Sequence, residues 1–156
     1  MRAILVHHAE AVDPGVDHMR PLSETGRRQA EAVAAALQGY GVAPVAVWHS
    51  GKLRARETAM ACWRALNPLA PFTAVRGLQP SDGPDTIATA LLAEDGDILL
   101  TGHMPHLPRL LHRLLTGRDD GGSAEFPLHG AMVLTRAEGG WRLDARVMAS
   151  GDLLIG

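Results

Sequence analysis

The sequence predicts an α/β fold, a three-layer α/β/α sandwich with a mostly parallel central sheet and one antiparallel edge strand. Short apolar runs that suit buried strands alternate along the chain with longer segments of helical periodicity. The runs at residues 3–7 and 97–101 are apolar on both faces, as the strands of a parallel sheet are. Residues 141–147 instead alternate apolar and charged side chains, which is the period of a half-exposed strand at an edge.

The first half of the chain predicts strands and helices in alternation. The expected elements are a strand at 3–7, a helix at 23–39, a strand at 45–49, a helix at about 52–66 and a short strand near 72–75. Ser23 can cap the first helix, and Gly39 can end it. Pro68 stops the second helix, because proline cannot continue the hydrogen-bonding pattern of a helix.

The second half continues the alternation and closes with a pair of strands. Pro84 opens a helix, the strand at 97–101 follows, and a leucine-rich helix comes after it. Two final strands at 131–135 and 141–147 are joined by a glycine-containing turn at 137–140, which predicts antiparallel pairing. We find no repeat and no low-complexity segment, so we expect a single domain over residues 1–156.

Composition excludes several classes of partner. The chain holds 15 Lys and Arg against 17 Asp and Glu, a net charge of −2, whereas binders of nucleic acid or membrane surfaces are usually basic. The single cysteine, Cys62, excludes an intrachain disulfide and fits a reducing compartment. No apolar run resembles a signal peptide or reaches the length of a membrane span. We therefore expect a cytoplasmic protein that binds neither nucleic acid nor membrane; the oligomeric state does not follow from the sequence.

Polar motifs follow three of the predicted strands. They are the pair His7-His8, the segment Ser50-Gly-Lys-Leu-Arg54-Ala-Arg-Glu-Thr58 and the segment Thr101-Gly-His103-Met-Pro105. Taken singly, each has an ordinary structural interpretation, such as a strand-end histidine satisfied by a loop or a solvated arginine. Because ligands of open α/β sheets bind beyond the carboxyl ends of the strands, we expect the three motifs to meet at one edge.

Together with Arg20-Pro-Leu-Ser-Glu-Thr-Gly-Arg-Arg-Gln-Ala30, these motifs resemble the histidine phosphatase superfamily, and the short chain is most similar to its SixA-type phosphohistidine phosphatases. The resemblance covers nearly the whole chain. It implies that His8 is the nucleophile and becomes phosphohistidine, that Arg54 binds phosphate, and that protonated His103 stabilises the transition state. Arg20 would bind phosphate or the partner protein. No cofactor and no metal are implied.

One residue departs from the family pattern. Where the family has Arg-His-Gly, this chain has His7-His8-Ala9, so His7 stands in the place of the first phosphate-binding arginine. Histidine offers at most two donors and loses its charge near neutral pH. Removing a donor to transition-state charge costs on the order of 10²–10³ in rate. We therefore expect a weakened phosphatase whose activity rises at mildly acidic pH as His7 becomes protonated.

The general acid is the least defined element of the predicted site. Phosphomonoesterases of the superfamily use a carboxyl group in a loop that corresponds to residues 78–85, and Asp82 is our candidate there. Asp85 and Glu10 are further carboxyl groups without a recognisable motif. The nitrogen of phosphohistidine can take up a proton before it leaves, so a site without a dedicated acid favours P–N substrates. The chain also has no room for an inserted roof over the site, which suits a phosphoryl group on a protein.

Three other functions compete with a phosphohistidine phosphatase. The first is a pseudo-phosphatase that binds a phosphoprotein without turnover, and the second is a phosphomonoesterase or mutase acting on a small phosphate ester. The third is a metal-dependent hydrolase that uses His7, His8, His103 and His106. We rank it low because no metal-binding spacing is present and adjacent side chains of a strand point to opposite faces. We expect His106 to face solvent and the remaining histidines to be structural or exposed: His18, His49, His112 and His129.

Overall fold

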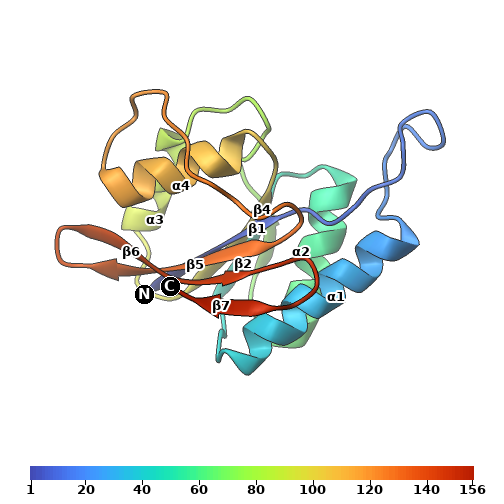
Figure 1. The fold of residues 1–156 in the computed structure, drawn as a ribbon, viewed down its shortest axis with the longest axis horizontal. Helices are drawn as coiled ribbons and strands as arrows, with labels where there is room; N and C mark the ends of the chain where they lie inside the picture. The colour runs from blue at the N-terminus through green and yellow to red at the C-terminus, as the bar shows by residue number, and fades with distance from the viewer.

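The computed structural model describes residues 1–156, which form one mixed sheet flanked by helices (Figure 1). The elements in chain order are β1 (Arg2–His7), α1 (Glu24–Gly39), β2 (Ala46–His49), α2 (Leu53–Leu66), β3 (Phe72–Ala74), α3 (Asp85–Leu92), β4 (Ile98–Gly102), α4 (His106–Thr116), β5 (Ala131–Ala137), β6 (Gly140–Val147) and β7 (Leu153–Ile155). The predicted α/β fold class is confirmed, and the predicted elements lie close to these bounds.

The sheet has a parallel half and an antiparallel half. Its strand order is β3-β2-β4-β1-β5-β6-β7, and the first four strands run parallel. β1 and β4, which are apolar on both faces, lie at the centre as predicted. The pairs β1–β5, β5–β6 and β6–β7 are antiparallel.

The antiparallel half is larger than predicted. The sequence predicts one antiparallel edge strand, whereas β5, β6 and β7 all form antiparallel pairs. β6 is not the edge strand, because β7 pairs with it from Val147↔Leu153 to Ala145↔Ile155. β7 is not predicted from the sequence, because three residues are too few to show an alternating pattern of apolar and polar side chains.

The apolar residues of β6 pack on both faces of the sheet, because the register shifts opposite Val133 and Leu134. Trp141 and Leu143 pack against the core under α3 and α4, and Ala145 and Val147 belong to the core under α1 and α2.

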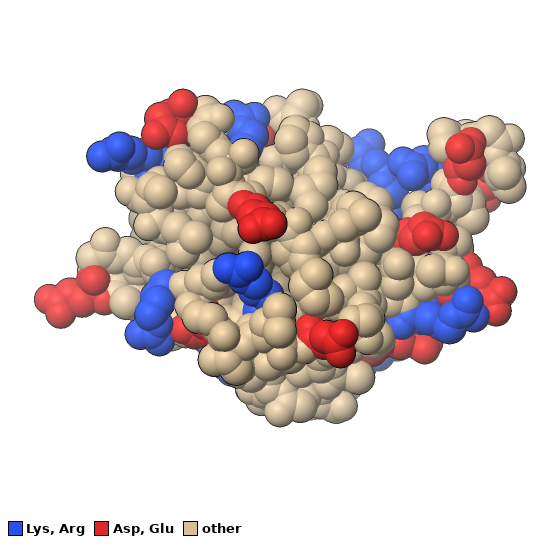
Figure 2. Space-filling model, in the orientation of Figure 1, with Lys and Arg blue, Asp and Glu red and all other residues tan.

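Helices cover both faces of the sheet (Figure 1). α1 and α2 pack on one face, where the core includes Val33, Leu37, Ala59 and Cys62. α3 and α4 pack on the other, where the leucines of α4 join Ile87 and Leu91 in a second core. None of the helices combines the length and apolar character that a bilayer-spanning segment needs. Figure 2 shows acidic and basic side chains scattered over the visible face without a large patch of one sign.

Strand register brings three loops to one edge of the sheet. His7 at the end of β1 is level with Gly102 at the end of β4, and His49 of β2 is level with Thr101. The segments that follow these strands therefore leave the sheet from the same edge. They carry the three polar motifs with His7-His8, Arg54 and His103.

Candidate active site

The loops after β1 and β4 place two histidines side by side. The ring centroids of His8 and His103 lie 5.1 Å apart, and His103 is almost completely buried. Arg54, in the first turn of α2, is close enough for its charge to lower the pKa of both rings, although burial lowers each pKa more. The structure therefore brings together the three side chains to which the family resemblance assigns catalysis.

His8 is held with a free lone pair. Its backbone N–H donates to the Gly102 carbonyl over 3.1 Å, and its Nδ1 contacts the Ala9 carbonyl oxygen at 2.7 Å. Because a carbonyl can only accept, the ring proton is on Nδ1 and the lone pair is on Nε2. Burial lowers the pKa of His8 to about 4 against the opposing effect of the Ala9 carbonyl, and Arg54 lowers it further. The Nε2 of His8 is thus unprotonated at neutral pH, which is the state that a nucleophile requires.

Thr58 ties the segment after His8 to the helix that carries Arg54. Its Oγ1 accepts from the Ala9 N–H at 3.0 Å and donates to the Arg54 carbonyl at 2.8 Å. Ala9 itself is buried and packs with Leu22 and Ala30, so its methyl group fills a small apolar cluster. These contacts fix the spacing between the nucleophile and the guanidinium.

His103 is oriented by Ser50. The two side chains are joined by a 2.7 Å hydrogen bond between Ser50 Oγ and His103 Nε2. The Ser50 hydroxyl, which accepts the Lys52 N–H, can donate to Nε2, and in that arrangement the ring proton of His103 is on Nδ1. Burial lowers the pKa of His103 to about 3, and His8 and Arg54 lower it further, so the ring is neutral in the unliganded site. The protonated His103 expected in the transition state stays a prediction.

Two buried nitrogens of the site have no partner in the protein. They are Arg54 Nε and His103 Nδ1. Buried polar atoms normally find a hydrogen-bond partner, and leaving one unpaired is costly. An anion with several oxygen acceptors satisfies both atoms at once, as a phosphoryl group would.

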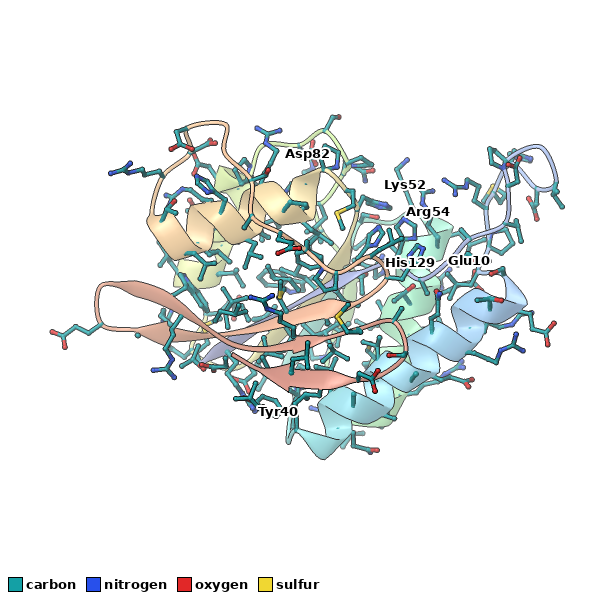
Figure 3. All side chains as sticks on the ribbon, viewed as in Figure 1. Glu10, Tyr40, Lys52, Arg54, Asp82 and His129 are labelled. Carbon is teal, nitrogen blue, oxygen red and sulfur yellow. The ribbon has the colours of Figure 1, made fainter.

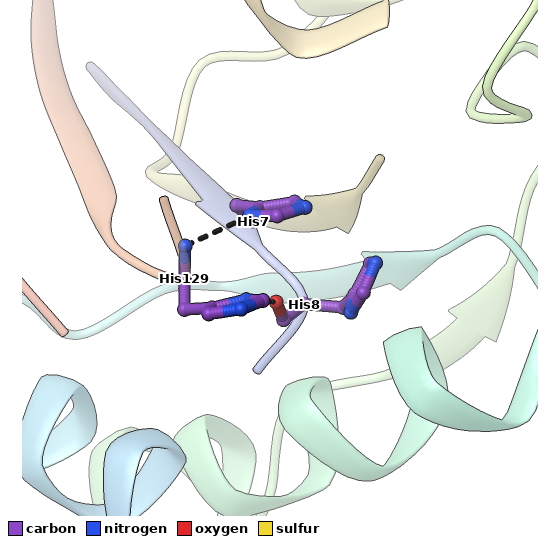
Figure 4. Close-up of side chains that lie close together, drawn as sticks. All are labelled: His7, His8 and His129. Carbon is purple, nitrogen blue, oxygen red and sulfur yellow. Dashed lines mark hydrogen bonds between the residues drawn. The ribbon is translucent and has the colours of Figure 1, made fainter. Parts of the chain in front are cut away.

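His7 forms a second pair with a residue from a distant part of the chain, His129 (Figure 4). Its Nδ1 accepts the His129 backbone N–H at 2.8 Å, and the two rings stack with centroids 4.9 Å apart and an interplanar angle of 4°. The Nδ1 of His129 contacts the His8 carbonyl oxygen at 2.7 Å.

The expected protonation of His7 at mildly acidic pH is wrong. Burial lowers the pKa of His7 to about 2, and His8, His129, His103 and Arg54 lower it further. His7 is 4% exposed and has no acidic neighbour among these groups that would stabilise a charge. The ring is neutral throughout the working pH range.

Arg20 and Asp82 lie at the periphery of the site. The Arg20 Nε donates to the Val12 carbonyl at 3.1 Å, and its charge contributes to lowering the pKa of His8 after burial and Arg54. Asp82 is half-buried, accepts the Gln79 N–H at 2.8 Å, and lines with Ser50 a cavity of about 600 Å³. In Figure 3 the labels of Arg54 and His129 lie close together, and Asp82 lies apart from both, above α4.

The other carboxyl candidates have structural contacts. Glu10 is exposed and accepts a hydrogen bond from Ser23, the N-cap residue of α1, at 2.8 Å. Asp85 pairs with Arg113 of α4 at 2.7 Å. Both carboxylates thus take part in contacts that stabilise helices.

Two histidine predictions are corrected by the structure. His106 does not face solvent: its exposure is 0%, and neither ring nitrogen makes a hydrogen bond of normal geometry within the protein. His129 is part of the site rather than a merely structural or exposed residue. No sequence signal pointed to it, because it reaches His7 only through the antiparallel pairing of β5 with β1.

The site does not fit a metal centre. β1 ends at His7, so His7 and His8 are not separated by strand alternation as expected, and one ring nitrogen each of His7, His8 and His129 lie within 4.8 Å of one another. However, His7 Nδ1 accepts a backbone N–H, which leaves the ring proton on Nε2 and no lone pair for a metal. The nearby Arg54 charge further opposes a second cation.

The sequence match covers the histidine pair and the segment with Arg54, and it ends before the segment with His103. Residues 7–82 match the histidine phosphatase superfamily (branch 1), a span that begins at the histidine pair. Over this span the chain is similar in sequence to the histidine phosphatase superfamily, and its fold matches solved members over nearly the whole length. The two similarities together indicate a phosphatase, that is, a hydrolase of phosphoryl groups. No curated protein matches the chain in sequence.

Three solved structures illustrate the likeness. The protein histidine phosphatase SixA complexed with tungstate superposes with a TM-score of 0.83 at 22% identity, covering 96% of this chain and 97% of that one. The putative phosphohistidine phosphatase SixA from Agrobacterium tumefaciens gives 0.71 at 27% identity, with coverage of 99% and 97%. Its namesake from Nakamurella multipartitia gives 0.70 at 26%, with coverage of 93% and 94%.

Proposed function

We propose that this chain hydrolyses phosphohistidine on a protein through a phosphohistidine intermediate on His8. The observation that carries the proposal is the unprotonated Nε2 of His8 beside two buried donors without a protein partner, Arg54 Nε and His103 Nδ1. A nucleophile next to unsatisfied donors suits the transfer of a phosphoryl group, whose phosphorus is electrophilic and whose oxygens are negatively charged.

The reaction proceeds in two displacements. The lone pair of His8 Nε2 attacks phosphorus while the P–N bond of the substrate breaks, and the leaving imidazole keeps the bonding pair and takes up a proton. Arg54 and His103 donate to the non-bridging oxygens as their negative charge spreads. A water molecule then attacks the phosphorus of phospho-His8, which releases inorganic phosphate and restores the lone pair of Nε2.

The proton balance of the site supports a P–N substrate. An imidazole nitrogen that is protonated before the bond breaks leaves without a dedicated acid, whereas an alkoxide needs one. Asp82 is the candidate carboxyl group for such an acid, and its Oδ2 accepts a hydrogen bond from the Gln79 N–H. The similar structures named phosphohistidine phosphatases agree in substrate class with this chemistry.

A phosphate ester is the second candidate substrate, and the cavity lined by Ser50 and Asp82 favours it. The leaving group of a small phosphate ester could occupy this cavity of about 600 Å³ and receive its proton from the Asp82 carboxyl. The Asp82→Asn variant separates the two substrates. It should lose ester hydrolysis while keeping hydrolysis of phosphohistidine, for which no acid is required.

The decisive experiment follows phosphate release from a histidine-phosphorylated carrier protein. The wild-type chain should release phosphate, and the His8→Ala variant should not. His18→Ala serves as the matched control, because His18 is an exposed histidine in a loop. If the labelled carrier binds but keeps its phosphate, the chain is a phosphoprotein-binding relative without catalysis. Release that persists in His8→Ala would refute the proposed intermediate.

A further inference from the structure

The chain has a histidine, His7, at the position where the family pattern has its first phosphate-binding arginine. We infer that His7 in its neutral form is the donor to the phosphoryl group at this position and that His129 is the positioning residue that holds it so, a role that rests on the proposed function. His129 would act through two groups, its backbone N–H on His7 and its ring on the peptide of His8.

The backbone brings His129 to this place. The β1–β5 register pairs Val6 with Ala131, and the His7 N–H donates to the Gly130 carbonyl at 2.9 Å. His129 has a φ of +54°, a left-handed conformation that is uncommon and costs roughly 1 kcal/mol for a residue with a side chain. The chain keeps a histidine in this conformation, and its N–H and its ring both contact the histidine pair.

The location of each proton follows from the hydrogen bonds. A backbone N–H can only donate, so His7 Nδ1 is an acceptor and the single proton of the neutral ring is on Nε2. His8 has the opposite tautomer, with its proton on Nδ1 and its lone pair on Nε2. The two rings, with centroids 4.4 Å apart, thus differ in function: Nε2 of His7 is a donor and Nε2 of His8 is a nucleophile.

The ring of His129 holds the peptide that carries the nucleophile. Its Nδ1–H donates to the His8 carbonyl at 2.7 Å, because a carbonyl oxygen can only accept. Its plane lies almost parallel to the ring of His7, which fixes the orientation of that ring (Figure 4). Small displacements of reacting groups cost large factors in rate, so this support contributes to turnover rather than to binding alone.

The donor form of His7 persists across the pH range. The titratable and charged groups that act on it are His8, His129, His103 and Arg54, from the loops around it and from α2. None of them carries a negative charge, so nothing in the free site draws a second proton onto His7. The neutral N–H supplies part of the stabilisation that a guanidinium gives, without the electrostatic repulsion that a second cation beside Arg54 would bring.

The direct test is the ring-nitrogen NMR spectrum of the full-length chain, measured between pH 5 and 8 with and without inorganic phosphate. His7 should have the Nε2–H tautomer and His8 the Nδ1–H tautomer, and phosphate should shift the His7 Nε2 resonance. The His7→Gln variant assigns the signal. A His7 ring that carries its proton on Nδ1, or that titrates between pH 5 and 8 without phosphate, would overturn the inference.

Variants of His129 supply the kinetic test. His129→Gly tolerates the left-handed backbone and keeps the N–H but loses the ring, and we expect kcat to fall on the order of tenfold with KM changing less. His129→Asn also tolerates this backbone and restores a side-chain donor, so it should recover part of the loss. Equal kcat in wild type and His129→Gly would refute the positioning role.

The two proposals can fail separately. If the wild-type chain releases no phosphate while the tautomers and the phosphate shift are as stated, the proposed function fails and the assignment of His7 as an anion donor stands. If release depends on His8 but His7 has the other tautomer, the proposed function stands and the inference fails.

Discussion

The burial of His106 predicts a measurable loss of stability in mild acid. Its exposure is 0%, and neither ring nitrogen makes a hydrogen bond of normal geometry within the protein. Burial lowers the pKa of His106 to about 4; the Asp82 carboxylate and the nearby Gly83 backbone oppose this shift, and Arg109 adds to it. The perturbation is a change from pH 7 to pH 5 in the wild-type chain and in the His106→Leu variant, whose side chain has a similar volume.

The sign and the size follow from the two pKa values. In the unfolded chain a histidine has a pKa near 6.5, so at pH 5 the unfolded state binds a proton at this residue and the folded state does not. The free energy of unfolding therefore falls as the pH falls below 6.5. The stability that depends on a neutral His106 is fully present only above that pH. Between pH 7 and pH 5 the loss from this one residue is about 2 kcal/mol.

The assay is urea unfolding at pH 5, 6 and 7. The wild-type free energy of unfolding should fall by about 2 kcal/mol more than that of His106→Leu between pH 7 and 5. At pH 7 the leucine variant should be the more stable protein, because two unpaired buried nitrogens are removed. His18→Leu, a change at an exposed site, controls for the loss of a histidine as such. Equal losses in wild type and His106→Leu would refute the reasoning.

Three further predictions concern the catalytic site. In the pH range where urea titrations show a folded chain, the kcat/KM for phosphohistidine, corrected for spontaneous hydrolysis, should not fall with a midpoint near pH 6.5, because the pKa of His8 is lowered to about 4. A fall centred near pH 6.5 in the folded chain would contradict this. Thr58→Val should lower the free energy of unfolding by about 1–3 kcal/mol in urea titrations, because the buried Ala9 N–H loses its acceptor, and kcat should fall with it; unchanged values would show that the contact is dispensable. His7→Arg alone should not raise kcat, because the stacked ring of His129 restricts the longer side chain. The double variant His7→Arg/His129→Gly should have a higher kcat than His129→Gly alone. Additive effects of the two changes on kcat would count against this coupling.

Much of the fold and part of the site could be predicted from local patterns. Runs that are apolar on both faces mark β1 and β4 as central parallel strands, and parallel strands end at the same edge. That rule alone brings together the segments that hold His8, Arg54 and His103. The catalytic roles of these residues remain predictions from the family resemblance.

Protonation could not be predicted, because it depends on what packs around each ring. His7 and His103 occupy strand-end positions that are compatible with charge, yet burial and the neighbouring Arg54 make both neutral. His106 was expected at the surface from its place near a helix start, but the first turn of α4 faces the interior.

By itself, the sequence determined the order of the elements from β1 to β6, the central strands and the edge at which the polar motifs meet, because hydrophobic periodicity and the direction of parallel strands are local properties. Only the tertiary structure decided that His129 would contact the histidine pair, since the contact depends on a strand pairing between residues more than 120 positions apart. It also decided where each ring proton lies, because a tautomer is set by the hydrogen-bond partner that folding brings to the nitrogen.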